Sequence, residues 1–277
     1  MNGETRTLER LRSHYEIEKE LANRLRNSTR GERQSLYTSL YNELFRRVPD
    51  HPQLTRKHSQ QEIQKRITDQ MKFIKPFLGK NDTFMEIGAG DCTFTIEVAR
   101  FVNKVYAIDV SDELTRNLCK PDNLYFIMSD GTTIPVTQSS VNIAYSNQLM
   151  EHLHPDDALE QLKNTYNSLV SGGMYICITP SKLSGPHDIS KYFDKVATGF
   201  HLKEYTNYEL SKLFKEVGFH KIRVYPRIDK RYVGLPVLPL FLMELFLDNI
   251  PHKFARSIAN KTPYKSWLGV KMVGIKN

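Results

Sequence analysis

The 277-residue sequence predicts an α/β protein with a doubly wound, mainly parallel sheet. From residue 81 onward, short apolar runs typical of buried strands alternate with amphipathic stretches typical of helices. A glycine turn, Gly88-Ala89-Gly90, joins the first of these strands to a helix. That geometry lets a nucleotide-like ligand approach the backbone at a helix start. The alternation and the turn together indicate a ligand-binding sheet with helices on both faces.

Three helices are expected before the first strand, because apolar residues recur at spacings of three and four with charges between them. They cover residues 5–27, 31–48 and 59–78, and prolines after residue 48 separate the second from the third. This arm is too short to hold a large core of its own. We therefore expect residues 1–79 to pack on the following domain, as a lid over its pocket or as a contact between copies.

Residues 80–277 are expected to form one domain with seven strands, and residues 227–265 are expected to be an insert between the last two strands. Right-handed crossovers bring the carboxyl ends of parallel strands to one edge, where ligands bind. The expected helices cover residues 92–102, 111–119, 155–171 and 207–217. The expected strands cover residues 83–87, 104–109, 123–128, 141–146, 173–179, 220–226 and 266–274.

The formal net charge of +8 is unevenly distributed along the chain. Residues 1–80 hold 17 Lys/Arg and 10 Asp/Glu, residues 81–220 hold 11 and 18, and residues 221–277 hold 11 and 3, giving +7, −7 and +8. Basic extensions of this kind either attract an anionic partner or are solvated helix faces. No Lys/Arg block interleaved with aromatic residues is present, so nucleic-acid binding is not favoured.

The chain is expected to work in the cytoplasm. Its polar, charged N-terminus lacks the pattern of a signal peptide. Cys92, Cys119 and Cys177 show no metal or redox spacing, which favours free thiols in a reducing compartment.

Residues 232–250 form a very apolar segment, near the roughly 20 residues that span a bilayer. Pro236, Pro239 and Glu244 interrupt it, and it lies between two expected strands, so we expect no transmembrane segment. A pocket wall or the interface of a homodimer is the favoured role. Docking on a membrane surface is the alternative, which nearby basic residues support.

Acidic residues stand where the expected parallel strands end. Glu86 lies just before the glycine turn, Asp109 ends the next strand, and Asp130 follows the third. The spacing from Gly88 to Asp109 is close to the roughly 20 residues between a nucleotide turn and its ribose carboxylate. A bound phosphate would gain nothing from Glu86, whereas a cationic cofactor without phosphate tolerates it. This disfavours NAD as the ligand.

In this order the motifs resemble those of class I S-adenosylmethionine-dependent methyltransferases, of the small-molecule, methyltransferase type 11-like group. The matching segments are Glu86-Ile-Gly-Ala-Gly-Asp, with Cys92 in place of a third glycine, Ala107-Ile-Asp109-Val-Ser, Ser129-Asp130-Gly131, Ser146-Asn-Gln-Leu-Met-Glu-His152-Leu and the strand that follows Gly172-Gly173. The resemblance covers residues 80–226 and the final strand.

The resemblance implies a Rossmann-like fold, with S-adenosylmethionine as cofactor and S-adenosylhomocysteine as product. Asp109 would then hold the ribose hydroxyls, and Asp130 would meet the adenine amino group. The cofactor-binding residues that it implies are Glu86, Gly88, Ala89, Gly90, Asp109, Val110, Asp130, Gly131, Asn147 and Gln148.

Methyl transfer from a sulfonium is an in-line displacement, which needs an aligned nucleophile and, for a hydroxyl, a base. Glu151 and His152 stand where a base would act, and neutral imidazole suits that task. The other role open to His152 is to cap a helix or pack in the pocket wall. His187 and His201, in the irregular segment after the fifth expected strand, are further catalytic candidates.

The resemblance extends to ubiquinone-pathway and small-RNA 2′-O-methyltransferases, which hold a divalent metal with Glu-x-x-Glu-His and a later His. In this sequence Gln148 stands in place of the first Glu, and an amide is a poor partner for a hard cation. We therefore assign no metal. If a metal were bound, its ligands would be Glu151, His152 and His201.

The sequence thus predicts a methyltransferase that modifies a small organic molecule with an apolar part, at a hydroxyl oxygen. Three alternatives stay open: methylation of RNA or another macromolecule, a membrane-associated lipid methyltransferase, and a catalytically silent scaffold that binds the cofactor. A homodimer is one arrangement that the apolar segment would allow.

Overall fold

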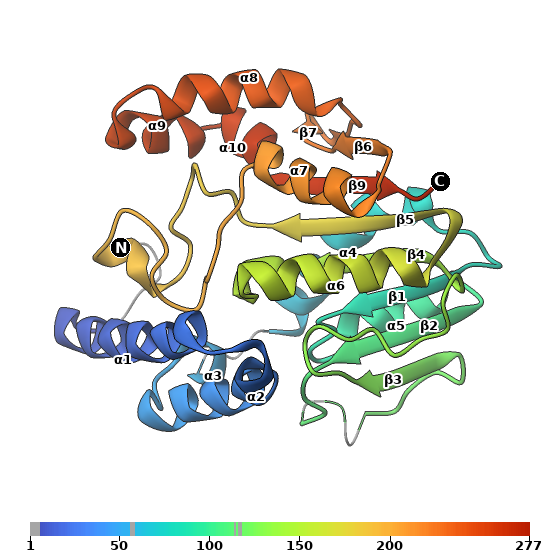
Figure 1. The fold of residues 1–277 in the computed structure, drawn as a ribbon, viewed down its shortest axis with the longest axis horizontal. Helices are drawn as coiled ribbons and strands as arrows, with labels where there is room; N and C mark the ends of the chain where they lie inside the picture. Colours follow the sequence, from blue (N-terminus) through green and yellow to red (C-terminus); the bar gives the residue numbers. More distant parts are fainter. Residues whose placement is uncertain (1–5, 56–58, 114, 116–117) are drawn as a thin grey trace.

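A seven-stranded sheet forms the centre of the molecule (Figure 1). The computed structural model describes residues 6–55, 59–113, 115 and 118–277. The strand order is β3-β2-β1-β4-β5-β9-β6, where β1 Thr83–Ile87, β2 Lys104–Asp109, β3 Leu124–Met128, β4 Val141–Asn147, β5 Leu169–Thr179, β6 Lys221–Val224 and β9 Val270–Ile275 are the strands. The first five strands in that order are parallel, and β9 runs antiparallel to both of its neighbours. The prediction of a doubly wound, mainly parallel sheet is confirmed.

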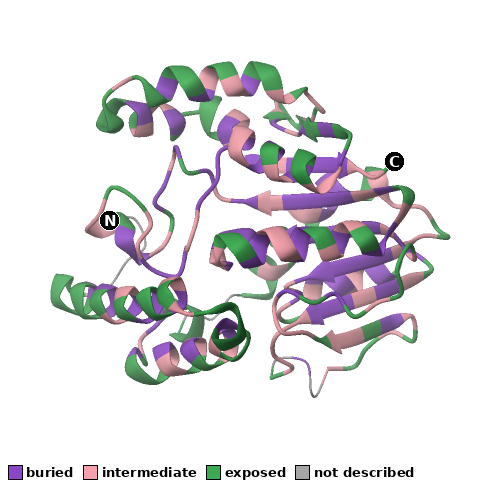
Figure 2. Ribbon diagram, viewed as in Figure 1, coloured by how far each residue is buried: buried purple, intermediate pink, exposed green. Residues whose placement is uncertain are grey.

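Helices cover both faces of the sheet: α4 Gln60–Ile74, α5 Thr93–Ala99, α6 Pro155–Ser168 and α7 Asn207–Val217. Successive residues of β1 point to opposite faces, because side chains alternate along a strand. Phe84 enters the core beneath α4 and α5, and Met85 enters the core beneath α6 and α7. The central strands β1 and β4 are accordingly buried along most of their length, whereas the edge strand β3 is mostly half-buried or exposed (Figure 2).

The helix expected at residues 111–119 falls partly on residues 114, 116 and 117, which lie outside the described residues. The described residues of this stretch form turns rather than a helix. The N–H of Thr115 donates to the carbonyl of Asp112 at 2.9 Å, a bond of the i to i+3 type that closes a turn.

Two strands begin four residues away from their expected starts, and the other strand bounds differ by no more than two residues. β5 begins at Leu169, inside the helix expected to run to residue 171, because Leu169 pairs with Val141 across a bulge. The last strand begins at Val270 instead of residue 266, because a short helix, α10 (Tyr264–Leu268), takes the preceding residues.

Two long N-terminal helices lie beyond the carboxyl ends of the strands (Figure 1). They are α1 (Leu8–Asn27) and α2 (Arg30–Arg47), and Thr29 opens α2 with a capping box. A short helix, α3 (Pro52–Thr55), follows, and α4 then packs on the sheet. The residues expected to form one arm are therefore divided between a part beyond the strand ends and a part that covers a sheet face.

A buried ion pair fixes α2 to the start of α6. Arg33 donates from Nε and Nη2 to the two carboxylate oxygens of Asp157 at 2.6 and 2.7 Å, and the Tyr37 hydroxyl donates to the same carboxylate at 2.7 Å. Burial acts to raise the pKa of Asp157, but the hydrogen bonds from Arg33 and Tyr37 outweigh it and hold the pKa below its ordinary value.

We expect Asp157→Ala to lower the free energy of unfolding by about 3 kcal/mol, because it leaves the Arg33 guanidinium buried without its partner. Urea unfolding measures this loss. Since the folded-state pKa of Asp157 is depressed, its contribution is present above the unfolded pKa and is lost as the pH falls through the folded pKa. Asp156→Ala is the matched control, because that neighbouring side chain is 81% exposed. Equal stability of the two variants would contradict the prediction.

The insert before the last strand forms a helical lobe with a small hairpin, β7 Arg227–Ile228 and β8 Arg231–Tyr232, followed by α8 Val237–Asp248, α9 His252–Ala259 and α10. Glu244 of α8 is buried and accepts from the N–H groups of Asn207 and Tyr208, at 2.7 and 3.0 Å. These are orphan donors at the start of α7, so the carboxylate holds α8 onto α7. Among the described residues, no helix combines the length and apolar character needed to cross a bilayer.

Candidate active site

The glycine turn leaves β1 at the carboxyl edge of the sheet. Gly88 and Gly90 have φ angles of +75° and +53°, which glycine adopts without strain, and Ala89 between them is buried. The N–H of Gly88 donates to the carbonyl of Ile108 at 2.8 Å, which ties the turn to β2. A Cβ built at Gly90 would meet no heavy atom within 4 Å. The backbone there is open to a close approach by a ligand.

Asp109, the last residue of β2, holds the turn in place. Its carboxylate accepts from the N–H of Gly90 at 2.7 Å and from the N–H of Ser111 at 3.2 Å, one bond to each oxygen. A carboxylate has about four acceptor positions, so lone pairs remain for two hydroxyl groups. The carbonyl of Val110 accepts from the Thr38 hydroxyl of α2 at 3.3 Å, which brings the N-terminal helices to this edge.

Glu86 lies beneath the turn and is buried, with a short hydrogen bond from the Thr95 hydroxyl. Burial raises the pKa of Glu86 to about 8, with the charges of Asp91 and Asp109 acting in the same direction and the Thr95 bond acting against them. A group with this pKa is poised to ionise when a positive charge approaches.

Asp130 organises the turn after β3. Its carboxylate accepts from the backbone N–H groups of Thr132 and Thr133 at 2.9 and 2.7 Å, and Gln34 of α2 donates to it at 2.9 Å. Gly131 follows with φ of +91°, and a Cβ there would meet the Tyr37 ring at 3.3 Å. The residues expected to meet adenine thus lie directly under α2.

The chain that leaves β4 packs against the glycine turn. Asn147 ends β4, and Gln148 follows with φ of +57° and an N–H that donates to Ile178 at 2.8 Å. A Cβ on Gly88 would meet Leu149 at 3.2 Å, so this segment and the turn are in contact. The short helix η2 (Met150–His152) comes directly after.

Glu151, His152 and His201 form a cluster beside this contact. One side-chain nitrogen or oxygen from each lies within 4.8 Å of the other two, and the imidazole centroids of His152 and His201 are 4.9 Å apart. Glu151 is fully buried, and one of its oxygens accepts from the Thr179 hydroxyl at 2.9 Å. Its other oxygen, Oε1, has no partner among the described residues. A buried acceptor without a donor marks a place for a ligand.

Comparison with known proteins bears directly on these residues. Residues 85–177, which run from β1 through the cluster to β5, match the family model described as methyltransferase domain. No curated protein sequence matches the chain. The matched residues, about a third of the chain, carry the sequence pattern of S-adenosylmethionine-dependent methyltransferases.

Solved structures share the fold of this methyltransferase. A chain from the complex between the Haloferax volcanii Trm112 methyltransferase activator and a methyltransferase is 16% identical, with a TM-score of 0.55 over 78% of this chain and 92% of that one. An S-adenosylmethionine-dependent methyltransferase from Thermotoga maritima is 15% identical, with a TM-score of 0.52 over 78% and 91%. Haemonchus contortus phosphoethanolamine N-methyltransferase 1, solved with phosphoethanolamine and S-adenosylhomocysteine, is 14% identical, with a TM-score of 0.55 over 90% of this chain and 50% of that one.

The residues of the methyltransferase domain fit a cofactor with hydroxyl groups and positive charge. The open backbone at Gly90 accepts a close approach, Asp109 has acceptor positions to spare, and Glu86 supplies an acid near the turn. Bound S-adenosylmethionine would supply an electrophilic methyl group on a sulfonium. Asn147 and Gln148 lie at the end of β4, on the path from the turn to the cluster.

We expect the methyltransferase to bind S-adenosylmethionine more tightly as the pH rises through about 8, because ionised Glu86 attracts a cationic ligand. Binding should therefore release protons near neutrality. Titration calorimetry in two buffers of different ionisation enthalpy measures the proton release. Glu86→Gln should reduce it, whereas Glu97→Gln on α5 serves as the control. Equal proton release by wild type and Glu86→Gln would show that another group titrates.

His152 of the methyltransferase is held in one tautomer. Its Nδ1 lies 3.1 Å from the carbonyl of Phe200, which can only accept, so Nδ1 carries the hydrogen and Nε2 keeps a lone pair. The Tyr41 hydroxyl of α2 lies 3.0 Å from the same Nδ1. Burial lowers the pKa of His152 to about 3, and the neighbouring His201 acts in the same direction. His152 is therefore neutral at physiological pH and takes up a proton only at high energetic cost.

Glu204 is a functional candidate that the sequence reasoning missed. Its Oε1 accepts from Nδ1 of His201 at 2.7 Å, and both side chains are buried. Burial acts to lower the pKa of His201, but the Glu204 hydrogen bond and the charge of Glu151 outweigh it and raise the pKa above its ordinary value. The three-residue spacing of the histidine and the acid was visible in the sequence. The sequence could not show that the side chains of His201 and Glu204 are both buried and face each other.

His187 lies in the same irregular segment between β5 and α7 as His201 and Glu204, but it plays a different part. Its backbone N–H donates to Oε1 of Glu204 at 2.7 Å, and its Nε2 lies 3.1 Å from the carbonyl of Ser181. Burial lowers the pKa of His187. The structure thus places His187 behind Glu204, where it braces the carboxylate, and its catalytic role stays a prediction.

The cluster of Glu151, His152 and His201 has the composition of a cation site, with two imidazoles and a carboxylate. Each of the three side chains also has a protein partner, which is Thr179 for Glu151, Phe200 for His152 and Glu204 for His201. We keep the expectation that no divalent metal is needed. Methyl transfer in the presence of a chelator tests it.

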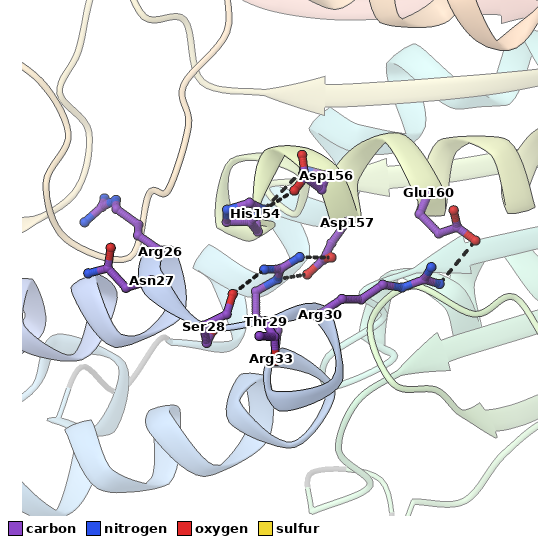
Figure 3. A pocket seen from close by; sticks show the side chains of 10 residues that line it. All are labelled: Arg26, Asn27, Ser28, Thr29, Arg30, Arg33, His154, Asp156, Asp157 and Glu160. Carbon is purple, nitrogen blue, oxygen red and sulfur yellow. Dashed lines mark hydrogen bonds and ion pairs between the residues drawn. The ribbon is translucent and has the colours of Figure 1, made fainter.

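A polar hollow of about 520 Å³ lies where α2 meets the start of α6 (Figure 3). Its three arginines are all engaged: Arg33 with Asp157, Arg30 with Glu160 at 3.3 Å, and Arg26 with backbone carbonyls of residues 198–201. The hollow is therefore a polar junction between helices, and we assign it no ligand. It is lined by Arg26, Asn27, Ser28, Thr29, Arg30, Arg33, His154, Asp156, Asp157 and Glu160.

Proposed function

We propose that the chain methylates a hydroxyl oxygen of a small organic molecule that has an apolar part. The observation that carries the proposal is the unpartnered Oε1 of Glu151, buried beside two imidazoles and next to the cofactor turn. A polar group of a substrate bound there can donate to this oxygen, and Leu149 links the site to the glycine turn.

In this proposal His201 is the base and Glu204 positions it. The hydroxyl proton passes to Nε2 of His201, while the oxygen lone pair forms the bond to the methyl carbon and the carbon–sulfur bond breaks. The sequence favoured His152 as the base. The raised pKa of His201 suits this role better than the low pKa of His152. Neutral His152 instead accepts, with its free Nε2, a hydrogen bond from a different donor group of the substrate.

Aromatic side chains support the apolar part of the substrate. Tyr41 of α2 lies 4.7 Å from the Phe200 ring, centroid to centroid, and 6.2 Å from the His152 ring. The hydroxyl of Tyr41 and the helix that carries it belong to the N-terminal part of the chain, so we propose that α1 and α2 close the site and exclude water. The two buried thiols, Cys92 and Cys177, suit the cytoplasm that we propose for the enzyme.

A methyl-transfer screen with isotope-labelled S-adenosylmethionine tests the proposed function. The purified protein is incubated with metabolite extracts, which are then separated into small-molecule, nucleic-acid and protein fractions. Label in the small-molecule fraction, with the methyl-carbon NMR shift of an ether, is the expected result. Label in nucleic acid or protein, or on nitrogen, would sink the proposal. Cofactor binding without transfer to any fraction would favour the scaffold alternative.

A further inference from the structure

The outer face of α8 carries four large apolar side chains that are open to solvent. Leu238, Leu242, Leu245 and Phe246 are 63%, 56%, 47% and 63% exposed. Their spacing puts them on one side of the helix, opposite Leu240, Glu244 and Leu247, which are buried. The apolar segment expected to form a pocket wall or a dimer interface therefore turns these four apolar residues outward.

This face is part of a well-packed lobe. Glu244 anchors α8 to the start of α7, and Leu247 lies in a small core with residues of α9 and α10. On α9, Phe254 is 66% exposed, although Ala255 beside it is buried. Exposed aromatic and leucine side chains on firmly packed helices are a contact surface without a partner in the described chain.

Basic side chains flank this face at both ends. Exposed Arg227, Lys230 and Arg231 lie in the hairpin before α8, and exposed Lys253 lies in the first turn of α9. Residues 227–265 hold seven Lys/Arg and three Asp/Glu, and one of those acids is the buried Glu244. The surface thus joins an apolar stripe to positive charge, the combination that binds anionic lipid surfaces.

We propose that the α8–α9 face docks on the surface of an anionic phospholipid bilayer, with α8 lying in the plane of the interface. α8 has 12 residues, and a helix needs about 20 to span the hydrocarbon core. A second copy of the chain fits this face less well, because the same basic residues would then approach one another across the interface.

Docking would bring residues 181–205, which carry part of the catalytic cluster, near the lipid. Leu183 of the insert packs in the core of the lobe, and the Asn260 side chain donates to the carbonyl of Ser184 at 3.1 Å. Residues 181–205 carry His187, His201 and Glu204. The docking surface stands on its own observations and does not depend on the identity of the methyl acceptor.

Vesicle flotation tests the proposal with the full chain. Wild type is expected to float with vesicles of equal parts phosphatidylcholine and phosphatidylglycerol and to stay unbound with phosphatidylcholine alone. The double variant Phe246→Ser, Phe254→Ser should bind the anionic vesicles about tenfold more weakly, because two apolar anchors are lost. Lys253→Gln should weaken binding about fivefold, the effect of one charge near an anionic surface.

Leu54→Ser on α3 is the matched control, because Leu54 is 51% exposed but lies outside the lobe. It should float like wild type. Circular dichroism and cofactor titration establish that each variant is folded. The proposal is overturned if wild type does not bind anionic vesicles, or if the double variant binds them as well as wild type does. A concentration-dependent dimer that the double variant abolishes in the absence of vesicle binding also overturns it.

Discussion

Asp109→Ala should weaken S-adenosylmethionine binding about 100-fold, because each hydrogen bond to a charged group contributes about 1.5–3 kcal/mol and two ribose hydroxyls would lose their acceptor. The substitution also removes the acceptor of the Gly90 N–H, which holds the glycine turn. Isothermal titration calorimetry measures the affinity directly and needs no knowledge of the methyl acceptor.

The conservative variant Asp109→Asn separates the two effects. Its amide oxygen can still accept from Gly90, but the charge is gone, so we expect a loss of about tenfold. Asp122→Ala is the control, since Asp122 is an exposed acid on the loop between β2 and β3. Unchanged affinity in Asp109→Ala would mean that the cofactor does not sit on this edge of the sheet.

The second large effect concerns His201. We expect His201→Ala to slow methyl transfer about a thousandfold while leaving the affinity for S-adenosylmethionine unchanged, because general base catalysis accelerates such steps by about 10² to 10⁴. Single-turnover assays with the acceptor found in the screen measure the rate. His152→Ala should cost less, because His152 orients the substrate without taking the hydroxyl proton.

The pH profile distinguishes a base from a structural histidine. The rate should rise as the pH rises through the raised pKa of His201, because only the neutral imidazole accepts a proton. Glu204→Gln removes the charge that raises this pKa, so the rise should move to lower pH. Glu216→Gln, an exposed acid on α7, should leave the profile in place. A profile that does not move in Glu204→Gln would rule out the proposed pairing.

The sheet could be predicted from the sequence because its signals are local. Apolar runs such as Thr83–Ile87 and Lys104–Asp109 are buried on both faces and end at residues that stop a strand, and both strands have the expected bounds. The shared fold and the methyltransferase class followed from the same motifs. The stretch at 111–119 looked helical only because its composition does not oppose a helix, and its described residues close turns instead.

Tertiary contacts between distant segments could not be predicted in this way. Gln34 reaches Asp130, and Tyr41 reaches His152, although nothing in the spacing of the N-terminal helices specifies their height over the sheet. The inward orientation of the Glu204 side chain likewise depends on how residues 181–205 pack near the ends of β4 and β5. Such positions are set by packing of distant parts of the chain, and one sequence holds no local pattern for them.

The position of β9 has a consequence for how the protein is made. β9 lies between β5 and β6, yet the ribosome synthesises it after both of them. Until residues 270–275 emerge, β5 has an unpaired edge and β6 cannot join the sheet, because β9 is its neighbour there. If translation halted before that strand, the released polypeptide would expose unpaired strand edges. Chaperones and proteases recognise such incompletely folded chains. The sheet is therefore completed late in synthesis, when β9 pairs with both β5 and β6.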